Sequence, residues 1–260
     1  MSTLPSENLI LLNNVCKDFD TPKGKITVLQ HINLTVNKGE KVCIVGPSGC
    51  GKTTILNMIA GFLQPSSGEV SINGKKVVKP GPDRTVVFQK DSVFPWLTVR
   101  KNLEYGPKVR GLPRSEWESK IDFYLEKVKL TEFADRYPKE LSGGMRKRVD
   151  IARAYINSPE ILLMDEPFGP LDVMTKEVMQ KDLLDLTREE NKSIIFITHD
   201  IEEAVFLGDR VIVMTARPAK IHSDIKIPFP KDRDPSLKME PEFQRLRKQI
   251  DGIFKGVEQE

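Results

Sequence analysis

The glycine-rich segment at residues 46–54, GPSGCGKTT, has the residue types and spacing of a phosphate-binding loop. Glycines let backbone N–H groups turn around a phosphate without a Cβ atom in the way, and a following helix directs its positive end toward the same anion. Lys52 adds a cation for the β- and γ-phosphates, and the Thr53 hydroxyl is suited to Mg²⁺. We therefore expect a nucleoside triphosphate and Mg²⁺ to be held by Gly46, Pro47, Ser48, Gly49, Cys50, Gly51, Lys52, Thr53 and Thr54.

Two adjacent carboxylates, Asp165 and Glu166, follow the apolar run at residues 161–164. A buried strand that ends in a carboxylate places it at the carboxyl edge of an open α/β sheet, where such sheets bind ligands. Asp165 is then expected to hold the metal through water, and Glu166 to polarise the water that attacks the γ-phosphate. Read alone, each acid also fits a structural role, at a strand end or a loop start, and the phosphate-binding loop favours the chemical role of Asp165.

A second glycine motif, formed by Ser142, Gly143 and Gly144, precedes a basic helical stretch at residues 145–155. Serine is a good N-cap, and glycines leave the first N–H groups of a helix accessible, so this helix end is a second candidate anion site. The two anion sites need not meet within one chain. A ligand held between two chains could use both.

The elements that must position these motifs alternate between short apolar runs and segments with helical apolar spacing. A strand at 41–45 leads directly into the glycine loop, and a helix at 54–60 follows it and stops at Gly61. Such alternation predicts an α/β core with a parallel sheet. The other expected strands are 85–88, 161–165, 193–198 and 210–215, and the other expected helices are 175–190 and 201–207.

Two regions depart from this alternation. Residues 9–12 and 28–36 alternate apolar and polar side chains, which predicts strands of an antiparallel sheet. Residues 98–157 are rich in charged, helix-favouring types, which predicts a helical insert. Breaks in these helices are expected at Gly106-Pro107, Gly111-Leu112-Pro113 and Tyr137-Pro138.

The length favours one large domain over residues 1–260. A final helix at 242–254 has an apolar face, for which docking on its own domain is the favoured role and a partner or lipid surface the alternative. The predicted divisions are about 1–97 and 158–227 for the core with its β subdomain, 98–157 for the helical subdomain and 228–260 for a short C-terminal tail.

Composition restricts the possible functions. Hydrophobic residues make up 39% of the chain and charged residues 30%, as in folded globular proteins. The 40 basic and 37 acidic residues give a net charge of +3 and are scattered, so nucleic acid is not an expected partner. No apolar run approaches the ~18 residues of a membrane-spanning helix, and the N-terminal residues do not resemble a signal peptide. We expect a cytosolic protein unless something else holds it at a membrane.

The three cysteines, Cys16, Cys43 and Cys50, are too few and too scattered for a disulfide framework or a zinc site. This usage fits a reducing compartment. Cys50 lies inside the glycine loop, but no histidine or acid is placed locally to activate its thiol. We expect it to be a small loop residue.

These motifs, in this order, resemble those of the ATP-binding cassette family over nearly the whole chain. Residues 141–144 are similar to the family's signature sequence and residues 169–172 to its D-loop. Gln89 resembles its Q-loop residue and His199 its switch histidine. The resemblance implies an α/β fold: a P-loop NTPase core with an N-terminal antiparallel β subdomain and an inserted α-helical subdomain.

The resemblance also implies a head-to-tail dimer with two ATP molecules and Mg²⁺ at the interface. Each nucleotide lies between one subunit's phosphate loop and the other's signature helix. The Q-loop residue then touches Mg²⁺ and the attacking water, and the switch histidine touches the γ-phosphate. The implied residues are Glu166, His199 and Gln89 for catalysis, Thr53, Gln89 and Asp165 for the metal, and both glycine motifs, Phe19 and Asp172 for the nucleotide.

Three departures from the family pattern stand out. Met145 replaces the usual Gln of the signature, Lys147 stands where relatives often have Gln, and Pro170 replaces a smaller D-loop residue. Because Ser142 and the glycines contact phosphate, activity is expected to survive. Phe19 matches the aromatic that stacks on adenine, and a core phenylalanine nearby is its competitor.

The stretches at 82–84, 88–89, 94–99, 166–169 and 217–218 look like the nitrate, sulfonate, taurine and bicarbonate importer group. This implies an ATP-hydrolysing subunit at the cytoplasmic face of the bacterial inner membrane, coupled to uptake of a small anion. The implied partners are a second ATPase subunit, transmembrane permease subunits and, indirectly, a periplasmic or lipid-anchored substrate-binding protein. The region of Phe94 and Trp96 is where a permease would dock, or both rings belong to the core of the helical lobe.

Other cassette ATPases share the nucleotide motifs. Those of DNA repair, chromosome organisation or translation form one alternative, which the lack of heptads, of a second cassette and of a basic surface disfavours. An ATPase of a lipid or peptide exporter fits the motifs, but not the Pro-Trp-Leu stretch at 95–97.

Overall fold

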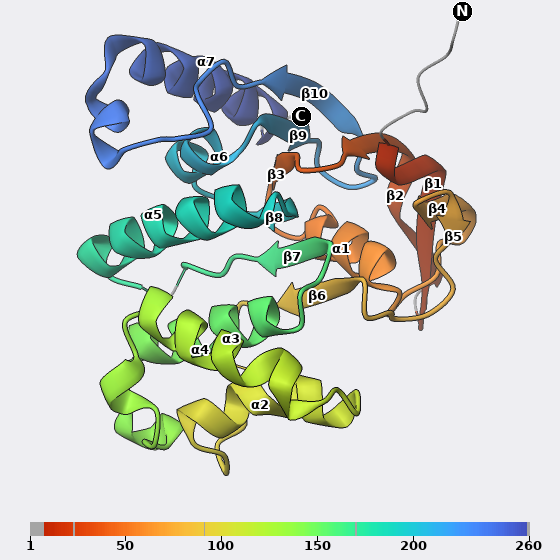
Figure 1. The fold of residues 1–260 in the computed structure, drawn as a ribbon. Helices are drawn as coiled ribbons and strands as arrows, with labels where there is room; N and C mark the ends of the chain where they lie inside the picture. Colours follow the sequence, from red (N-terminus) through yellow and green to blue (C-terminus); the bar gives the residue numbers. More distant parts are fainter. Residues whose placement is uncertain (1–7, 23, 91, 170, 259–260) are drawn as a thin grey trace, which may run out of the picture.

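The structure is a computed structural model that describes residues 8–22, 24–90, 92–169 and 171–258. A six-stranded sheet with the order β10-β9-β3-β8-β7-β6 crosses its centre (Figure 1). The strands from β9 to β6 run parallel, and β10 pairs antiparallel with β9. The bounds are β3 (Lys41–Val45), β6 (Arg84–Val87), β7 (Ile161–Asp165), β8 (Ser193–Ile197), β9 (Arg210–Met214) and β10 (Ile221–Lys226).

The predicted parallel strands agree with β3 and β6 to β9 to within one residue at either end. Their continuous apolar runs are explained by burial on both faces, which is complete along β3 and β8. The edge strand β10 was not predicted, because its side chains alternate between exposed and half-buried positions and are mostly polar or charged.

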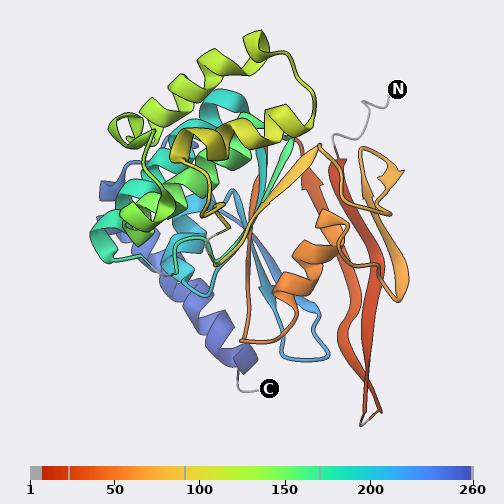
Figure 2. The same ribbon diagram turned by 90° about the horizontal axis from the view of Figure 1, so that it is seen from below.

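A second, antiparallel sheet has the order β2-β1-β4-β5. Its strands are β1 (Asn8–Thr21), β2 (Gly24–Asn37), β4 (Ser67–Ile72) and β5 (Lys75–Lys76). The predicted strands at 9–12 and 28–36 are only the more buried parts of β1 and β2, whose distal parts form a partly exposed, irregular hairpin (Figure 2). Exposure on both faces removes the apolar alternation that reveals a half-buried strand.

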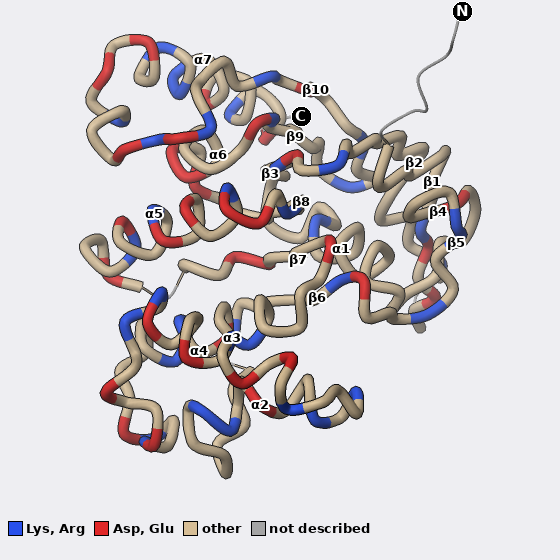
Figure 3. Tube along the Cα trace, in the orientation of Figure 1, with Lys and Arg blue, Asp and Glu red and all other residues tan. Residues whose placement is uncertain are grey.

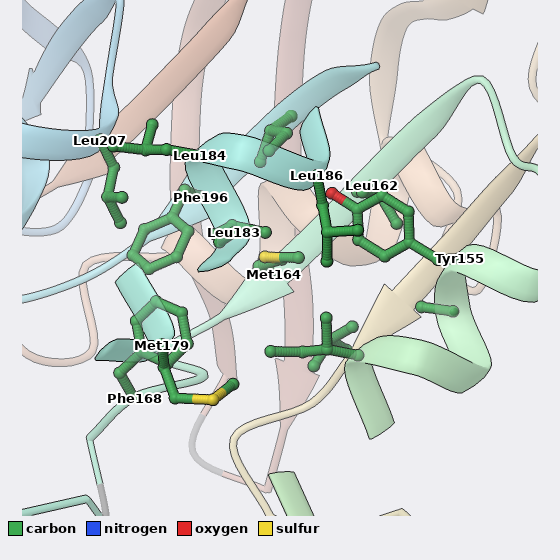
Figure 4. Packing of buried hydrophobic residues seen from close by; sticks show 14 of the residues in the cluster. Tyr155, Leu162, Met164, Phe168, Met179, Leu183, Leu184, Leu186, Phe196 and Leu207 are labelled. Atoms are coloured by element: carbon green, nitrogen blue, oxygen red, sulfur yellow. The ribbon is translucent and has the colours of Figure 1, made fainter. Parts of the chain in front are cut away.

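Two hydrophobic clusters cover the two faces of the central sheet. On one face, α1 (Lys52–Ala60) lies between the two sheets, and β1 and β2 contribute to the same cluster. On the other face lie α5 (Val173–Glu190) and α6 (Ile201–Leu207). There Met164 of β7 and Phe196 of β8 pack with Met179 and Leu183 of α5 (Figure 4). Alternate residues of each strand therefore enter different clusters.

Between β6 and β7 the chain forms helices, as predicted for residues 98–157. They are α2 (Val99–Val109), α3 (Arg114–Lys127) and α4 (Gly143–Ile156), with two short 3₁₀ turns, Thr131–Phe133 and Pro138–Glu140, between α3 and α4. The expected break at Gly106-Pro107 is wrong, because α2 continues through Pro107. This proline lies in the last turn, so its missing N–H removes one helical hydrogen bond just before the helix ends.

The C-terminal segment contains a 3₁₀ turn at Pro235–Met239 and the helix α7 (Pro241–Glu258). Phe243, Ile250 and Val257 of α7 are buried, and the helix packs on α6. The prediction that its apolar face docks on its own domain is confirmed. Within the described part of the chain, every helix is too short or too polar to cross a bilayer. Basic and acidic residues are interspersed along the whole trace (Figure 3).

Candidate functional site

A cavity of about 690 Å³ lies at the carboxyl edge of the central sheet. Parallel strands end there side by side, so residues that follow β3, β7, β8 and β9 converge on one place. The lining residues are Val28, Gly46, Ser48, Gly49, Gly51, Lys52, Thr53, Thr54, Glu166, His199, Arg217, Phe254 and Glu258.

The glycine loop has a conformation that its glycines require. Gly49 and Gly51 have φ angles of 74° and 115°, in the left-handed region. A Cβ atom on Gly51 would lie 2.8 Å from Cδ2 of Leu29 and 2.9 Å from Cγ1 of Val28. The helix α1 begins at Lys52 with no side-chain cap and no acid in its first turn, so its first N–H groups remain available to an anion.

Lys52 closes the loop on itself. Its ammonium donates hydrogen bonds to the carbonyl oxygens of Gly46 at 2.7 Å and Pro47 at 3.0 Å. Pro47 and Cys50 do not line the cavity, and the Cys50 side chain is buried in the apolar cluster behind the loop. Burial raises the pKa of the Cys50 thiol. Cys50 is thus a packing residue that offers only its backbone to a phosphate.

Thr53 and Asp165 together form an oxygen pair suited to Mg²⁺. The Thr53 hydroxyl donates a hydrogen bond of 2.9 Å to Oδ2 of Asp165. Burial raises the pKa of Asp165, against the effect of this hydrogen bond. Mg²⁺ in nucleotide sites uses one or two protein oxygens and completes its shell with waters and phosphates, so this donor set fits the ion.

Gln89, Glu166 and His199 come from three different loops and meet at one carboxylate oxygen. Gln89 Nε2 donates a hydrogen bond of 3.0 Å to Oε2 of Glu166, and Nδ1 of His199 lies 3.3 Å from the same oxygen. These residues follow β6, β7 and β8, which are neighbours in the sheet. The predicted trio is therefore brought together.

The backbone of Glu166 has φ of 44°, which is rare for a residue with a Cβ. Its N–H donates to the Ile197 carbonyl at 2.9 Å, and its own carbonyl accepts from Gly169 at 3.2 Å. The Glu166 side chain is 22% exposed. This conformation is held by the neighbouring strand and turns the carboxylate into the cavity.

A buried chain of hydrogen bonds supports the histidine loop. The Thr198 hydroxyl accepts from Asp200 N at 3.0 Å and is bonded to the carboxylate of Glu203. Gln180 of α5 donates to Glu203 at 3.0 Å, and Lys238 donates to Gln180 at 2.9 Å. Burial raises the pKa of Glu203. The C-terminal segment is thereby linked to the residues on either side of His199.

The sequence did not predict this chain of hydrogen bonds. Glu203 could have been noticed as the residue three positions after the helix cap Asp200. The pairing of Lys238 with Gln180 has no local signal, because the two residues are 58 positions apart and only the tertiary fold joins them. Arg217, Phe254 and Glu258 were also not predicted to line the cavity.

The second glycine motif and the D-loop acid lie elsewhere in this chain. Ser142 caps α4 by accepting a hydrogen bond of 3.2 Å from Met145 N, and Gly143 and Gly144 form the first turn. Asp172 caps α5 by accepting from Thr175 N at 3.0 Å, and hydrogen bonding to Thr175 lowers its pKa. None of these residues is among those that line the cavity of the same chain.

Phe19 is also outside the lining set. It lies opposite Ile26 on the β1–β2 hairpin, is 38% exposed and has Lys17 Nζ 5.1 Å from its ring centroid. Phe19 is therefore not a core residue, and its stacking on adenine stays a prediction.

Two of the three family departures have a structural explanation. Met145 packs against the large hydrophobic cluster, where an apolar side chain replaces the usual amide. Lys147 is 1% exposed, and its ammonium donates to the carbonyl oxygens of Phe88 at 2.9 Å and Gln89 at 3.2 Å. The third, Pro170, lies outside the described residues.

The fold and this cavity define a P-loop nucleoside triphosphatase, with a glycine loop between β3 and α1 and two acids, Asp165 and Glu166, at the end of β7. The sequence profile of the ABC transporter family matches residues 29–169. The chain belongs to the ABC transporter family, whose ATP-binding proteins are ATPases.

Known proteins agree with this assignment over most of the chain. The taurine import ATP-binding protein of Jannaschia sp. is 42% identical over 256 residues, with 96% of each chain covered. The nitrate import ATP-binding protein of Synechocystis sp. is 45% identical over 244 residues, with 92% of each covered. A solved dimeric ATP-binding cassette in a post-hydrolysis state, bound to ADP and Pi, is 33% identical with a TM-score of 0.75, covering 85% of this chain and 100% of that chain.

Proposed function

We propose that this chain is the ATPase subunit of an importer for a small anion, and that two copies hold ATP and Mg²⁺ head to tail between them. The observation that carries the dimer is the separation of the two anion sites. Ser142 and its glycines cap a helix whose end does not line the cavity of their own chain. A second copy can supply that helix end to the phosphate loop and receive the same contact in return, as in a two-fold symmetric dimer.

In this arrangement Glu166 accepts the proton of the attacking water, and Gln89 and His199 hold the carboxylate and the γ-phosphate in place. Lys52 and the N–H groups of the loop stabilise the charge that develops on the phosphates. Mg²⁺, held by Thr53, Asp165 and Gln89, supplies charge neutralisation on the β- and γ-phosphates when bound.

Complementation between two inactive variants tests the shared site. Lys52→Ala removes the loop cation, and Ser142→Arg blocks the signature helix, so each variant alone has two damaged sites per dimer. In a mixed head-to-tail dimer, one site combines the intact loop with the intact signature. Random mixing should then restore up to about one quarter of the wild-type ATPase rate. No recovery in the mixture, with both variants folded, would reject the shared site.

The permease is proposed to dock in a second cavity, of about 340 Å³, between β6 and helices α2 and α4. Its lining includes Phe88, Phe94 and Tyr105, with Phe94 and Tyr105 rings 4.5 Å apart. Trp96 is 69% exposed, so its placement in the core of the helical lobe is wrong. Exposed aromatic rings beside a groove that Phe88 helps to line, next to Gln89 in the sequence, suit a helix of a membrane partner.

Trp96→Ala tests this surface. The Trp96 ring is exposed, so the isolated variant should fold and hydrolyse ATP at the wild-type rate, whereas its recovery with the permease from solubilised membranes should fall several-fold. Equal recovery of wild type and variant would rule out the groove as the docking site. Identification of the attached permease and of its substrate-binding protein by mass spectrometry also tests the proposed anion import and the peripheral location at the cytoplasmic face of the membrane.

A further inference from the structure

A buried lysine joins the signature helix to the Q-loop. Lys147 lies in the second turn of α4 and is 1% exposed. Its ammonium donates to the backbone carbonyls of Phe88 and Gln89, at 2.9 and 3.2 Å, and lies 3.7 Å from a carboxylate oxygen of Asp150. Asp150 itself accepts from Ser92 N at 3.0 Å and from Arg153 at 3.1 Å.

Packing alone does not account for a charge in this place. Burial of an ammonium group is costly unless it is paired and hydrogen-bonded, and apolar side chains of similar size often give equal or greater stability. The Lys147 ammonium instead donates to the backbone carbonyl oxygens of two consecutive residues, Phe88 and Gln89. The family residue at this position is often Gln, which also carries N–H donors.

One of the two carbonyls that Lys147 holds belongs to Gln89, whose side chain contacts the proposed base, and the other belongs to the residue before it. Gln89 Nε2 donates to Oε2 of Glu166 at 3.0 Å. We propose that Lys147 is a positioning residue for ATP hydrolysis, which fixes the Gln89 backbone so that its amide reaches Glu166. This rests on the roles proposed above for Gln89 and Glu166. Lys147 thereby connects the orientation of the signature helix to the position of the Glu166 carboxylate.

Lys147→Met keeps an unbranched side chain, one atom shorter, and removes its donors. The variant should lower kcat at saturating Mg-ATP about tenfold while KM for ATP stays within about twofold, because misplacement of a reacting group slows chemistry more than binding. The second readout is a double-mutant cycle with Gln89→Ala. If Lys147 acts through Gln89, the double variant should be no slower than Gln89→Ala alone.

Lys147→Gln is the conservative variant and guards against a failure of the Met variant to fold. Its amide retains donors for both carbonyls, so its kcat should lie within about threefold of wild type. An unchanged kcat in Lys147→Met, additive losses in the cycle, or a kcat of Lys147→Gln as low as that of Gln89→Ala would each overturn the proposal. Wild-type turnover by Glu166→Gln would instead reject the assigned base, which separates the two failures.

A different observation concerns Arg217, in the loop after β9. This loop is held by hydrogen bonds of Ala219 with Val28 and Gln30, each of 2.9 Å, and of Thr215 with Lys220. The Arg217 guanidinium lies directly above the glycine loop, 3.3 Å from the position that a Cβ on Gly49 would take. Among the described residues that line the cavity, two carry a permanent positive charge, Lys52 and Arg217.

We infer that Arg217 binds the phosphate chain of the nucleotide from the side opposite to His199. Strand β3, which leads into the glycine loop, has β9 on one side and β8 on the other, so Arg217 and His199 approach the loop from opposite flanks. Glu166 and His199, which are proposed to act in hydrolysis, lie on the β8 side of the loop. Arg217 therefore contributes to nucleotide binding and not to the chemical step, and its fork of N–H donors suits phosphate oxygens.

Calorimetric titration with ATP and with ADP tests Arg217→Ala against Lys220→Ala, a matched variant that removes an exposed cation from the same loop. Arg217→Ala should raise the Kd of both nucleotides about tenfold, with kcat at saturation within about twofold, and Arg217→Lys should lie between it and wild type. Lys220→Ala should bind like wild type. A Kd for Arg217→Ala within twofold of wild type, or a loss of kcat without a change in Kd, would exclude the assignment.

Discussion

Gln89 and Glu166 are 77 positions apart in the sequence, yet the side-chain amide of one donates a hydrogen bond of 3.0 Å to the carboxylate of the other. They meet because β6 and β7 are parallel neighbours, so the residues that follow them leave the sheet at the same edge. His199, after the next strand, reaches the same oxygen at 3.3 Å. Contacts from two neighbouring loops therefore orient the carboxylate.

Replacement of Glu166 by Gln should leave ATP binding intact and slow hydrolysis by a factor of about 10² to 10⁴, the usual contribution of a general base. With hydrolysis blocked, ATP should accumulate between two copies, so sedimentation should show a dimer that wild type forms only transiently. Glu132→Gln, which changes an exposed acid of the helical insert, is the control. Wild-type turnover in Glu166→Gln would remove the base assignment.

Replacement of Lys52 by Ala should weaken ATP binding about 10- to 100-fold, because a hydrogen bond to a charged group contributes roughly 1.5–3 kcal/mol. The lysine also closes the loop through the Gly46 and Pro47 carbonyls, so the variant loses part of the preformed loop as well. Calorimetry with Mg-ATP measures the change. Wild-type affinity in this variant would contradict the assignment of the loop.

The parts of the site that sequence reasoning found share one property. Their residues follow apolar runs that read as buried strands, and the carboxyl ends of parallel strands must meet at one edge, so Asp165, Glu166 and His199 could be grouped without a structure. The family resemblance supplied Gln89. The α/β fold class was predictable for the same reason, because strands buried on both faces leave unmistakable apolar runs.

The features that the sequence did not predict include contacts between polar residues that are far apart in the chain and that belong to no recognisable motif. Lys147 reads as one of three basic residues on a helix, and only the packing of α4 against the Q-loop shows that its ammonium is buried. Arg217 was noted as part of a family stretch, and its place over Gly49 follows from strand order. The edge strand β10 and the outer β1–β2 hairpin lack the burial that creates a periodic pattern.

The hydroxyl of Thr53 is predicted to determine the Mg²⁺ requirement. Thr53→Val keeps the shape of the side chain and removes the hydroxyl that donates to Asp165 at 2.9 Å. Mg²⁺ then loses one protein oxygen, so the Mg²⁺ concentration for half-maximal ATPase activity should rise about tenfold. Thr53→Ser keeps the hydroxyl and should behave like wild type. Equal Mg²⁺ requirements in the Val and Ser variants would contradict the metal assignment.

Lys238 is predicted to stabilise the fold through the buried chain that ends beside His199. Lys238→Met removes the donor to Gln180 Oε1, which is buried, and the ammonium that lies 3.6 Å from Glu202. An unpaired buried acceptor costs about 1–3 kcal/mol, so the unfolding midpoint should fall by a few degrees. Lys248→Met, an exposed lysine of α7, should leave the midpoint unchanged.

The same variant separates support of the histidine loop from nucleotide binding. Lys238 does not line the cavity, and its link to His199 runs through Gln180, Glu203 and Thr198. At temperatures below the new midpoint, Lys238→Met should therefore bind ATP with wild-type affinity and turn it over several-fold more slowly. A less well-positioned His199 weakens the stabilisation of the transition state more than it weakens binding of the ground state. A wild-type kcat together with a lowered unfolding midpoint would show that these hydrogen bonds have only a structural role.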